Sequence, residues 1–203
     1  MRKGKLFVIS GPSGAGKTSI LYKVLNNIPG IEFSVSCTTR EKRKNEINGK
    51  DYFFISKENF EKKIKSNYFL EWAEVHEHYY GTSKEFVNMK INEGIDLILD
   101  IDVQGGLNVM KQNLDAVTIF ISPPSYEELK ERLVSRKTEC DKDIEIRLKN
   151  ARWEMKEFTK FKYFLTNQSL NDSIKKLESI IIAERLILEK SQYDDILKKI
   201  IGG

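Results

Sequence analysis

Short apolar runs alternate along this chain with longer segments whose apolar residues recur at helical spacing. The first run, Lys5–Ser10, contains the β-branched residues of a buried strand, and Ile20, Leu21 and Val24 then mark one face of a helix. Strands that alternate with helices in this way are typical of a parallel sheet covered by helices on both faces. The pattern therefore predicts an α/β fold.

Several of the expected elements have recognisable ends. Ser125 and Glu128 form a capping box after two prolines, and Gly94 stands where glycine commonly ends a helix. The expected strands are Lys5–Ser10, Glu32–Ser36, Tyr52–Ile55, Phe69–Val75, Asp96–Asp102, Ala116–Ser122 and Tyr163–Thr166. The expected helices are Ala15–Asn26, Lys57–Lys65, Lys84–Glu93, Val103–Gln112, Tyr126–Arg136, Lys142–Phe158 and Asp172–Glu189.

Two segments depart from the regular alternation. Residues 32–80 are rich in aromatic side chains and short strands, which predicts an inserted lobe. Residues 130–157 are highly charged and carry several arginines in two expected helices joined by a turn. We therefore expect one core that carries two smaller parts.

The residues between the first strand and the first helix read GPSGAGKT, from Gly11 to Thr18. A glycine-rich turn between a strand and a helix binds phosphate, because its backbone N–H groups point into one concavity at the positive end of the helix. Lys17 adds a positive charge for the β- and γ-phosphates, and the hydroxyl of Thr18 is a common ligand of Mg²⁺. A glycine-rich connector beside a surface lysine is the plainer alternative, and the flanking elements disfavour it. The loop predicts binding of a nucleoside triphosphate.

The expected lobe holds a second group of candidate residues. Arg40 and Arg43 are three positions apart, and two converging guanidinium groups can hold a phosphate in bidentate fashion. Glu71 lies within an apolar strand, where a carboxylate needs a partner such as the adjacent N–H donors of guanine. Each residue alone has a plainer explanation, since arginines are often solvated and a lone glutamate is often paired in a salt bridge. Their occurrence behind an intact phosphate loop favours a second nucleotide site.

Composition narrows the function classes further. With 203 residues, 40% hydrophobic content and a formal net charge of +4, the chain can build one core and suits a protein that handles small polyanions. Lysines that lie beside glutamates indicate solvated helix faces and disfavour a nucleic-acid surface. The apolar runs are too short for a membrane span, no signal peptide is recognisable, and Cys37 and Cys140 lie far apart. We expect a cytoplasmic protein with reduced thiols and no membrane or nucleic-acid partner, and both a monomer and a homo-oligomer fit this sequence.

Five stretches together resemble the guanylate kinase family in its bacterial form: SVSCTTR, GKDYFFI, FLEWAEVHEHYYGT, LILDIDVQGG and FLTN. The resemblance covers residues 4–188 and implies a P-loop nucleoside monophosphate kinase fold, with a five-stranded parallel core sheet flanked by helices, an inserted GMP-binding lobe and a helical lid. It implies transfer of the γ-phosphoryl group of ATP to GMP with Mg²⁺, giving ADP and GDP. It places the core at residues 4–33, 94–125 and 159–190, the lobe at about 34–93, the lid at about 126–158 and a helical tail at 191–203.

The functional residues of the family carry over onto matching positions of this sequence. The resemblance implies that ATP is bound by Gly11, Pro12, Ser13, Gly14, Ala15, Gly16, Lys17, Thr18, Arg132 and Asn167. It implies that GMP is bound by Ser36, Arg40, Arg43, Tyr52, Glu71, Tyr80, Thr82 and Asp102, with the arginines and tyrosines on the phosphate and Ser36, Glu71 and Thr82 on the base. It implies catalytic roles for Lys17, Arg43, Asp102, Arg136 and Arg147, and places Thr18 and, through water, Asp100 at the metal.

Four positions, Cys37, Lys42, Asn45 and Gln168, depart from the family pattern, and none of them removes a charged group assigned to chemistry.

Three other functions fit the sequence less well. Guanylate-kinase-like scaffold modules that bind proteins usually lose the phosphate loop, which is intact here. A monophosphate kinase for AMP, CMP or UMP is disfavoured by Glu71 and by the TTR and YYGT segments, and a nucleic-acid-binding module by the lack of a recognition fold or basic stripe.

Overall fold

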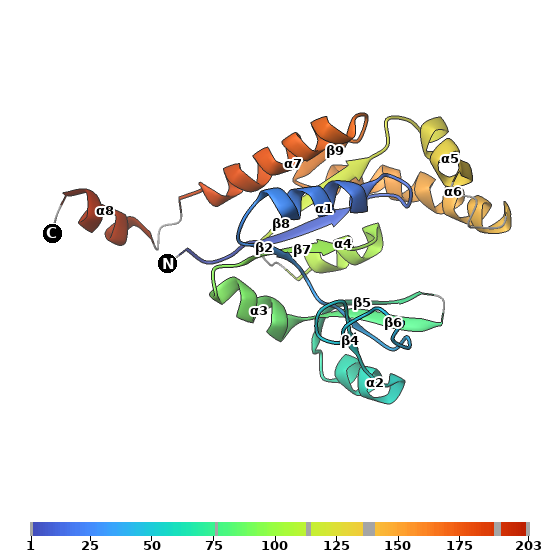
Figure 1. The fold of residues 1–203 in the computed structure, drawn as a ribbon, viewed down its shortest axis with the longest axis horizontal. Coiled ribbons are helices and arrows are strands. Elements are labelled where there is room, and N and C mark those ends of the chain that lie inside the picture. Colours follow the sequence, from blue (N-terminus) through green and yellow to red (C-terminus); the bar gives the residue numbers. More distant parts are fainter. Residues whose placement is uncertain (1, 76, 113–114, 136–140, 189–191, 202–203) are drawn as a thin grey trace.

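The computed structural model describes residues 2–75, 77–112, 115–135, 141–188 and 192–201 (Figure 1). Its centre is a five-stranded sheet with the strand order β2-β7-β1-β8-β9, in which all neighbouring strands are parallel. The predicted five-stranded parallel core is therefore confirmed. The strands are β1 (Leu6–Ser10), β2 (Ile31–Phe33), β7 (Asp96–Asp100), β8 (Ala116–Ser122) and β9 (Tyr163–Thr166).

Helices cover both faces of this sheet, as Figure 1 shows. Side chains alternate along the central strand β1, so that Phe7 and Ile9 pack toward α1 and α7 while Leu6 and Val8 pack toward α3 and α4. All four side chains are buried, which fixes the end of β1 and the loop that follows it. The helices are α1 (Lys17–Asn27), α3 (Lys84–Asn92), α4 (Val103–Met110) and α7 (Leu170–Arg185).

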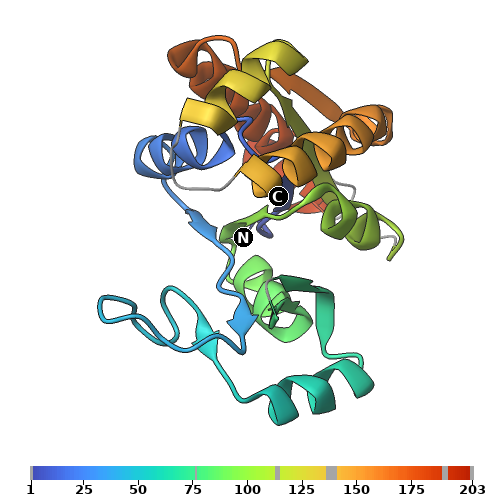
Figure 2. The same ribbon diagram turned by 90° about the vertical axis from the view of Figure 1, so that its right-hand side faces the viewer.

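The segment between β2 and α3 forms a second, smaller sheet with the order β4-β3-β6-β5. Figure 2 shows this part below the core, with α2 at its far side. Phe60 of α2 is fully buried and stacks on Phe69 with 4.3 Å between ring centroids, so aromatic packing holds this sheet together. The elements are β3 (Cys37–Thr38), β4 (Phe53–Phe54), α2 (Lys57–Lys65), β5 (Phe69–Val75) and β6 (His78–Ser83).

The sequence analysis missed strands β3 and β6. Tyr79, Tyr80 and Thr82 favour a strand, but the glycine in their midst, Gly81, is more typical of a turn or a bulge. Glycine is needed at that position, because a Cβ there would lie 3.0 Å from atoms of Phe60, Phe69 and Trp72. β3 is only two residues long and owes its extended form to pairing with β4 and β6. Long-range pairing, which a local pattern does not contain, produces both strands.

Other element ends agree with the prediction or shift for a local reason. The bounds of α2, β5, β8 and β9 are those expected, Gly94 ends α3 with a φ of 82°, and the Oγ of Ser125 accepts from the N–H of Glu128 at 3.1 Å. The first helix begins at Lys17 and not at Ala15, because Gly16 adopts a left-handed φ of 85°. Several other expected ends were wrong: β2 ends at Phe33 and not at Ser36, β7 ends at Asp100, α4 ends at Met110, α7 runs from Leu170 to Arg185, and α6 gives way to a 3₁₀ turn at Glu157. The remaining elements are α5 (Tyr126–Ser135), α6 (Asp141–Lys156), the 3₁₀ turn (Glu157–Lys160) and α8 (Tyr193–Ile201).

Two further expectations concern membrane-spanning helices and the two cysteines. Within the described ranges, no helix is long and apolar enough to cross a membrane. Cys37 is a buried free thiol, whereas Cys140 lies outside the described residues.

A buried carboxylate ties the N-terminal segment to two parts of the core. Asp96, at the start of β7, is fully buried. It accepts hydrogen bonds from Nη2 of Arg2 (2.9 Å), from the backbone N–H of Lys5 (2.7 Å) and from Nε of Arg185 (2.7 Å). Two guanidinium groups and one amide therefore compensate the cost of burying its charge.

We expect Asp96→Ala to lower the free energy of unfolding by about 3 kcal/mol, because three partly buried donors lose their acceptor. Urea denaturation followed by circular dichroism measures the change. Lys176→Ala is the control, since it removes only the exposed ion pair with Asp172 and should cost less than about 1 kcal/mol. Equal effects of the two substitutions would contradict the stabilising role of the Asp96 network.

Candidate active site

The glycine-rich loop lies at the carboxyl end of β1, between the ends of β7 and β8. Two of its glycines are required by their surroundings. Gly11 has a φ of 147°, and a Cβ there would lie 2.0 Å from the carbonyl oxygen of Ile121. Gly16 has a φ of 85°, and its Cβ would lie 2.4 Å from Nδ2 of Asn167. Glycine thus lets the loop pass close to both neighbours before α1 begins, which leaves backbone N–H groups at the helix N-terminus for an anion.

Lys17 folds back over this loop, and its Nζ donates to the carbonyl oxygen of Gly11 at 2.7 Å. A pocket of about 290 Å³ opens here, lined by residues 11–19 together with Asp100, Asp102 and Glu154. Solvent still reaches Asp100 at the end of β7, yet the surrounding protein atoms raise the pKa of its carboxyl, and the charge of Lys17 opposes the rise. The pocket therefore combines one cation, exposed backbone donors and carboxylates at its rim.

Glu154 is a pocket residue that the sequence analysis missed. It comes from α6 and is half-buried, and burial raises the pKa of its carboxyl, while Lys17 lowers that pKa and Asp102 adds to the rise. Glu154 lies seven positions after Arg147, so both side chains lie on the same side of the helix. This spacing is the signal that could have identified it.

The expected lid residues lie against the same loop. Nη1 of Arg147 donates to the Oγ of Ser13 at 2.7 Å. Arg132 donates to the carbonyl oxygen of Asn167 (3.0 Å), and Nδ2 of Asn167 donates to the carbonyl oxygen of Ala15 (2.7 Å). Asn167 is buried and is held in turn by the hydroxyl of Ser173 at 3.0 Å. The structure thus places Arg132, Asn167 and Arg147 against the predicted phosphate loop, whereas Arg136 lies outside the described residues.

A second pocket, of about 400 Å³, lies between α1 and the smaller sheet. Among its lining residues, Ser36, Tyr52 and Thr82 were predicted from the sequence to bind the acceptor nucleotide. Thr18 and Asp100 line this pocket as well as the pocket at the loop. The two pockets therefore meet at these two residues, which is the arrangement needed for a group to pass from one bound molecule to another.

Arg40 does not itself line the second pocket, but it forms a fork-like ion pair with Glu46, which does. Its two terminal nitrogens lie 2.6 Å and 3.0 Å from the carboxylate oxygens of Glu46. This hydrogen bonding raises the pKa of Arg40 and, together with the backbone N–H of Arg43, lowers the pKa of Glu46 to about 2. The pair is therefore fully ionised at neutral pH. The guanidinium also lies 5.5 Å from the ring centre of Tyr52, which packs edge-on against Tyr80.

The sequence analysis did not assign Glu46 to the site, although Arg43 and Glu46 share one short loop. The structure does not join the two arginines as expected. Arg43 is exposed, and its backbone N–H, rather than its guanidinium, donates to Oε2 of Glu46 at 2.8 Å. The signal for Glu46 was its position six residues after Arg40, within reach across a tight loop. Glu46 holds Arg40 in the bidentate geometry that a phosphate group would use.

Glu71 is buried in β5, as the sequence analysis expected. Its side chain accepts a hydrogen bond on Oε1 from the hydroxyl of Thr82 at 2.7 Å, and the Thr82 hydroxyl lies 3.4 Å from that of Ser36. Glu71 does not itself line this second pocket; it lines another cavity, of about 280 Å³, together with Asn108 and Gln112. Burial raises the pKa of its carboxyl, the hydrogen bond from Thr82 opposes this, and the charge of Asp102 adds to it.

Asp102 caps α4 and does not end a strand. Its Oδ1 accepts from the backbone N–H of Gly105 at 2.6 Å, which fixes the carboxylate near the carboxyl end of β7. Asp102 lines the pocket at the loop, and its Oδ1 and the Oε2 of Glu71 both lie within 3.5 Å of the place that a Cβ on Gly105 would take, so the two carboxylates are close neighbours.

A metal could be held here only with help from a ligand. Within the described part of the chain, no cluster of three or more His, Cys, Asp or Glu side chains could bind a metal ion by itself. The hydroxyl of Thr18 and the carboxylate of Asp100 line both pockets. Because Mg²⁺ takes one or two protein oxygens and fills its shell with phosphate oxygens and water, this donor set fits Mg²⁺ bound with a nucleotide.

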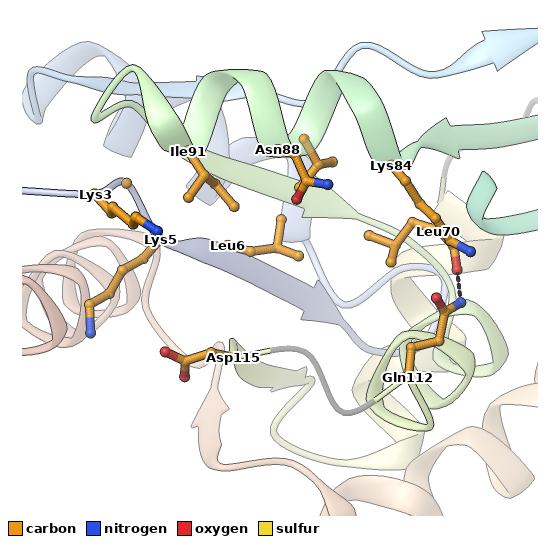
Figure 3. Close-up of a pocket in the computed structure, with 11 residues that line it drawn as sticks. Lys3, Lys5, Leu6, Leu70, Lys84, Asn88, Ile91, Gln112 and Asp115 are labelled. Atoms are coloured by element: carbon orange, nitrogen blue, oxygen red, sulfur yellow. Dashed lines mark hydrogen bonds between the residues drawn. The ribbon is translucent and has the colours of Figure 1, made fainter. Parts of the chain in front are cut away.

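Another pocket, of about 380 Å³, lies at the opposite end of the sheet and takes no part in this site. Figure 3 shows it between α3 and the start of β1, with Leu6 and Ile91 among its lining residues. No residue predicted from the sequence to bind a nucleotide lines it. Nε2 of Gln112 donates to the carbonyl oxygen of Leu70 at its edge, which joins the end of α4 to the smaller sheet.

Comparison with known proteins gives one consistent result. A family model described as Guanylate kinase matches residues 3–184. A guanylate kinase of Thermotoga maritima is 50% identical over 190 residues, covering 94% of this chain and 92% of that protein. A guanylate kinase of Clostridium tetani is 45% identical over 199 residues, covering 98% and 95%. A crystal structure of guanylate kinase from Anaplasma phagocytophilum superposes with a TM-score of 0.75 at 29% identity, covering 99% of this chain and 97% of that chain.

Proposed function

This chain belongs to the guanylate kinase family, and we propose that its two adjoining pockets bind ATP and GMP and transfer the γ-phosphoryl group between them. The fold is that of the P-loop nucleoside monophosphate kinases, and the products are ADP and GDP. The observation that carries the proposal is that Thr18 and Asp100 line both pockets, so that two bound nucleotides would meet phosphate to phosphate at these residues.

In the proposed ATP site, the loop binds the phosphates through its backbone N–H groups and through Lys17. Lys17 now donates to Gly11, and Arg147 to Ser13. Phosphate oxygens would replace these protein acceptors, so each cation exchanges one hydrogen bond for a stronger, charge-assisted one. Arg132 and Asn167 lie behind the loop and complete the site on the side of the nucleoside.

In the proposed GMP site, the phosphate takes the place of the Glu46 carboxylate on Arg40. The planar carboxylate and the tetrahedral phosphate each present two oxygens that accept parallel N–H bonds. The ion pair with Glu46 therefore holds the guanidinium of Arg40 in the orientation that a phosphate needs. Arg43, Tyr52 and Tyr80 contribute further donors to that phosphate.

The base of GMP is proposed to meet Ser36 and Thr82 in the same pocket, with Glu71 held behind Thr82. Guanine presents two adjacent donors, the N1–H and the 2-amino group, which suit the carboxylate of Glu71. Ser36 and Thr82 contribute hydroxyl groups beside it, and Asp102 adds a second carboxylate near the end of β7. These residues provide acceptors for donor groups, which favours guanine over bases that present acceptors there.

Catalysis rests on positioning and charge. The residues supply no nucleophile of their own, because the phosphate of GMP attacks the γ-phosphorus directly. Lys17, with Arg43, Arg136 and Arg147, is proposed to neutralise the charge that spreads over the transferred group, and Asp102 to orient the acceptor. Thr18 and, through water, Asp100 would hold Mg²⁺, which would supply further charge neutralisation at the phosphates.

The division of the chain and its setting belong to the same proposal. We propose a core at 4–33, 94–125 and 159–190, a GMP-binding lobe at about 34–93 and a lid at about 126–158, as in other members of the family. A non-catalytic protein-binding role is disfavoured because the loop from Gly11 to Thr18 is intact and is placed beside the lid arginines. A cytoplasmic location, with small molecules as the partners, fits substrates of this kind.

A coupled assay of ADP formation tests the function. With ATP and Mg²⁺, we expect turnover with GMP, and a kcat/KM at least about a hundredfold lower with AMP, CMP or UMP. Omitting the monophosphate gives the rate of ATP hydrolysis, and the Lys17→Ala protein purified in the same way controls for contaminating kinases. Absence of turnover with all four monophosphates would overturn the proposed function, and a preference for another base would overturn the assignment of guanine.

A further inference from the structure

Helix α4 contains two consecutive glycines in its first turn, Gly105 and Gly106. Glycine is less favourable than alanine inside a helix, because it loses more backbone freedom on folding. Neither residue has a positive φ, so the helical backbone itself does not require glycine at either position. Both glycines are buried, and the reason for each must lie in what surrounds the missing side chain.

Gly106 is explained by packing. A Cβ there would lie 2.7 Å from the Oγ of Ser10 and 3.3 Å from the ring of Phe161. The first distance is shorter than real contacts allow, and Ser10 is fully buried at the end of β1. Gly106 therefore lets α4 approach the central strand and is a structural residue.

Gly105 has surroundings of another kind. A Cβ there would lie 3.3 Å from Oδ1 of Asp102 and 3.5 Å from Oε2 of Glu71, and its remaining near neighbour is the Cβ of Ile101 at 3.5 Å. The two distances of 3.5 Å are ordinary contacts, whereas the 3.3 Å to Asp102 is tight, so a methyl group fits if that side chain shifts by a few tenths of an ångström. Its two polar neighbours are the carboxylates that we assign to the acceptor nucleotide.

The two oxygens of Glu71 differ in this arrangement. Oε1 accepts the hydrogen bond from the hydroxyl of Thr82, and the backbone N–H of Thr82 also stabilises the charged carboxylate. Oε2 is the oxygen that faces Gly105. Oδ1 of Asp102 accepts from the N–H of Gly105 itself. The bare Cα of Gly105 therefore lies directly beside Oε2.

We propose that Gly105 is a specificity-determining residue for the acceptor base, because its missing side chain keeps Oε2 of Glu71 open to the N–H donors of guanine. This inference rests on the proposed function. A methyl group at this position would cover Oε2 and stand in the path of the base edge. It would leave the groups that bind phosphate untouched, since Lys17 and Arg40 lie on other elements.

Gly105→Ala tests this role, with Gly106→Ala as the matched control one position along the same helix. For Gly105→Ala we expect a melting temperature no lower than that of the unsubstituted protein, because alanine favours the helix. We expect its KM for GMP to rise at least about tenfold, the cost of one obstructed hydrogen-bonding group, while its KM for ATP stays within about twofold. For Gly106→Ala we expect the reverse, with a lower melting temperature and a KM for GMP near normal in the folded protein.

Calorimetric titration with GMP, at a temperature where circular dichroism shows each variant fully folded, gives the affinity independently of turnover. A GMP affinity of Gly105→Ala equal to that of the unsubstituted protein would overturn the inference. So would a fall in melting temperature accompanied by equal changes in both KM values, because Gly105 would then be a packing residue. Binding and turnover of GMP by the unsubstituted protein are measured first. If that protein neither binds nor phosphorylates GMP, the proposed function itself is wrong.

Discussion

Lys17→Ala is expected to abolish phosphoryl transfer while the protein stays folded. Lys17 is half-buried, and its amino group donates to one backbone carbonyl among the described residues, that of Gly11, so the fold depends little on it. Its charge acts where the transferred group carries spread negative charge. Removing one preorganised charge of this kind lowers kcat by about a thousandfold or more.

The measurement is coupled turnover of ATP and GMP, with the melting temperature of each variant measured in parallel. Lys23→Ala is the matched control, because Lys23 is exposed on the same helix α1 and should leave turnover normal. A Lys17→Ala variant that keeps more than about a tenth of normal turnover would show that Lys17 has another role.

Glu71→Gln should narrow the preference for GMP over AMP by at least about tenfold, with a steep fall in GMP turnover. The structure indicates how the amide would be oriented. Because Thr82 donates to Oε1, the oxygen of the introduced amide would take that position and its NH₂ group the position of Oε2. A donor would then face the N1–H of guanine, whereas the N1 of adenine, which is an acceptor, would be accommodated.

The ratio of kcat/KM for GMP and AMP measures this effect. Glu74→Gln serves as the control, since Glu74 lies three positions along the same strand with its side chain exposed. If Glu71 only stabilises the lobe, the Glu71→Gln protein should melt at a lower temperature with an unchanged ratio. That outcome would contradict the assignment of base selectivity to Glu71.

The phosphate loop could be predicted because its determinants are local. The positive φ angles of Gly11 and Gly16, the strand before them and the helix after them lie within about twenty consecutive residues. The core sheet was equally predictable, since alternating strand and helix patterns leave few ways to bury the apolar faces. The burial of Glu71 followed from the apolar strand around it.

Glu46 and Glu154 were missed because each acts on a partner that the sequence pattern does not place beside it. Glu46 reaches Arg40 across a loop whose shape no periodicity describes. Glu154 reaches the neighbourhood of Lys17 from a helix more than a hundred residues later in the chain. Strand β6 was missed for the same reason, because its pairing with β5 and β3 continues the strand through Gly81, where the sequence alone suggests a turn.

The sequence by itself determined the phosphate loop, the α/β core and the residue types available to each nucleotide, because local backbone preference and hydrophobic period suffice for these. Only the tertiary structure decided which groups meet. It placed Thr18 and Asp100 at the junction of two pockets, gave Arg40 a carboxylate partner and set a bare glycine beside Oε2 of Glu71. Those arrangements depend on contacts between elements distant in the chain, and their free energy comes from burial and pairing that exist only after the sheet and its helices have packed.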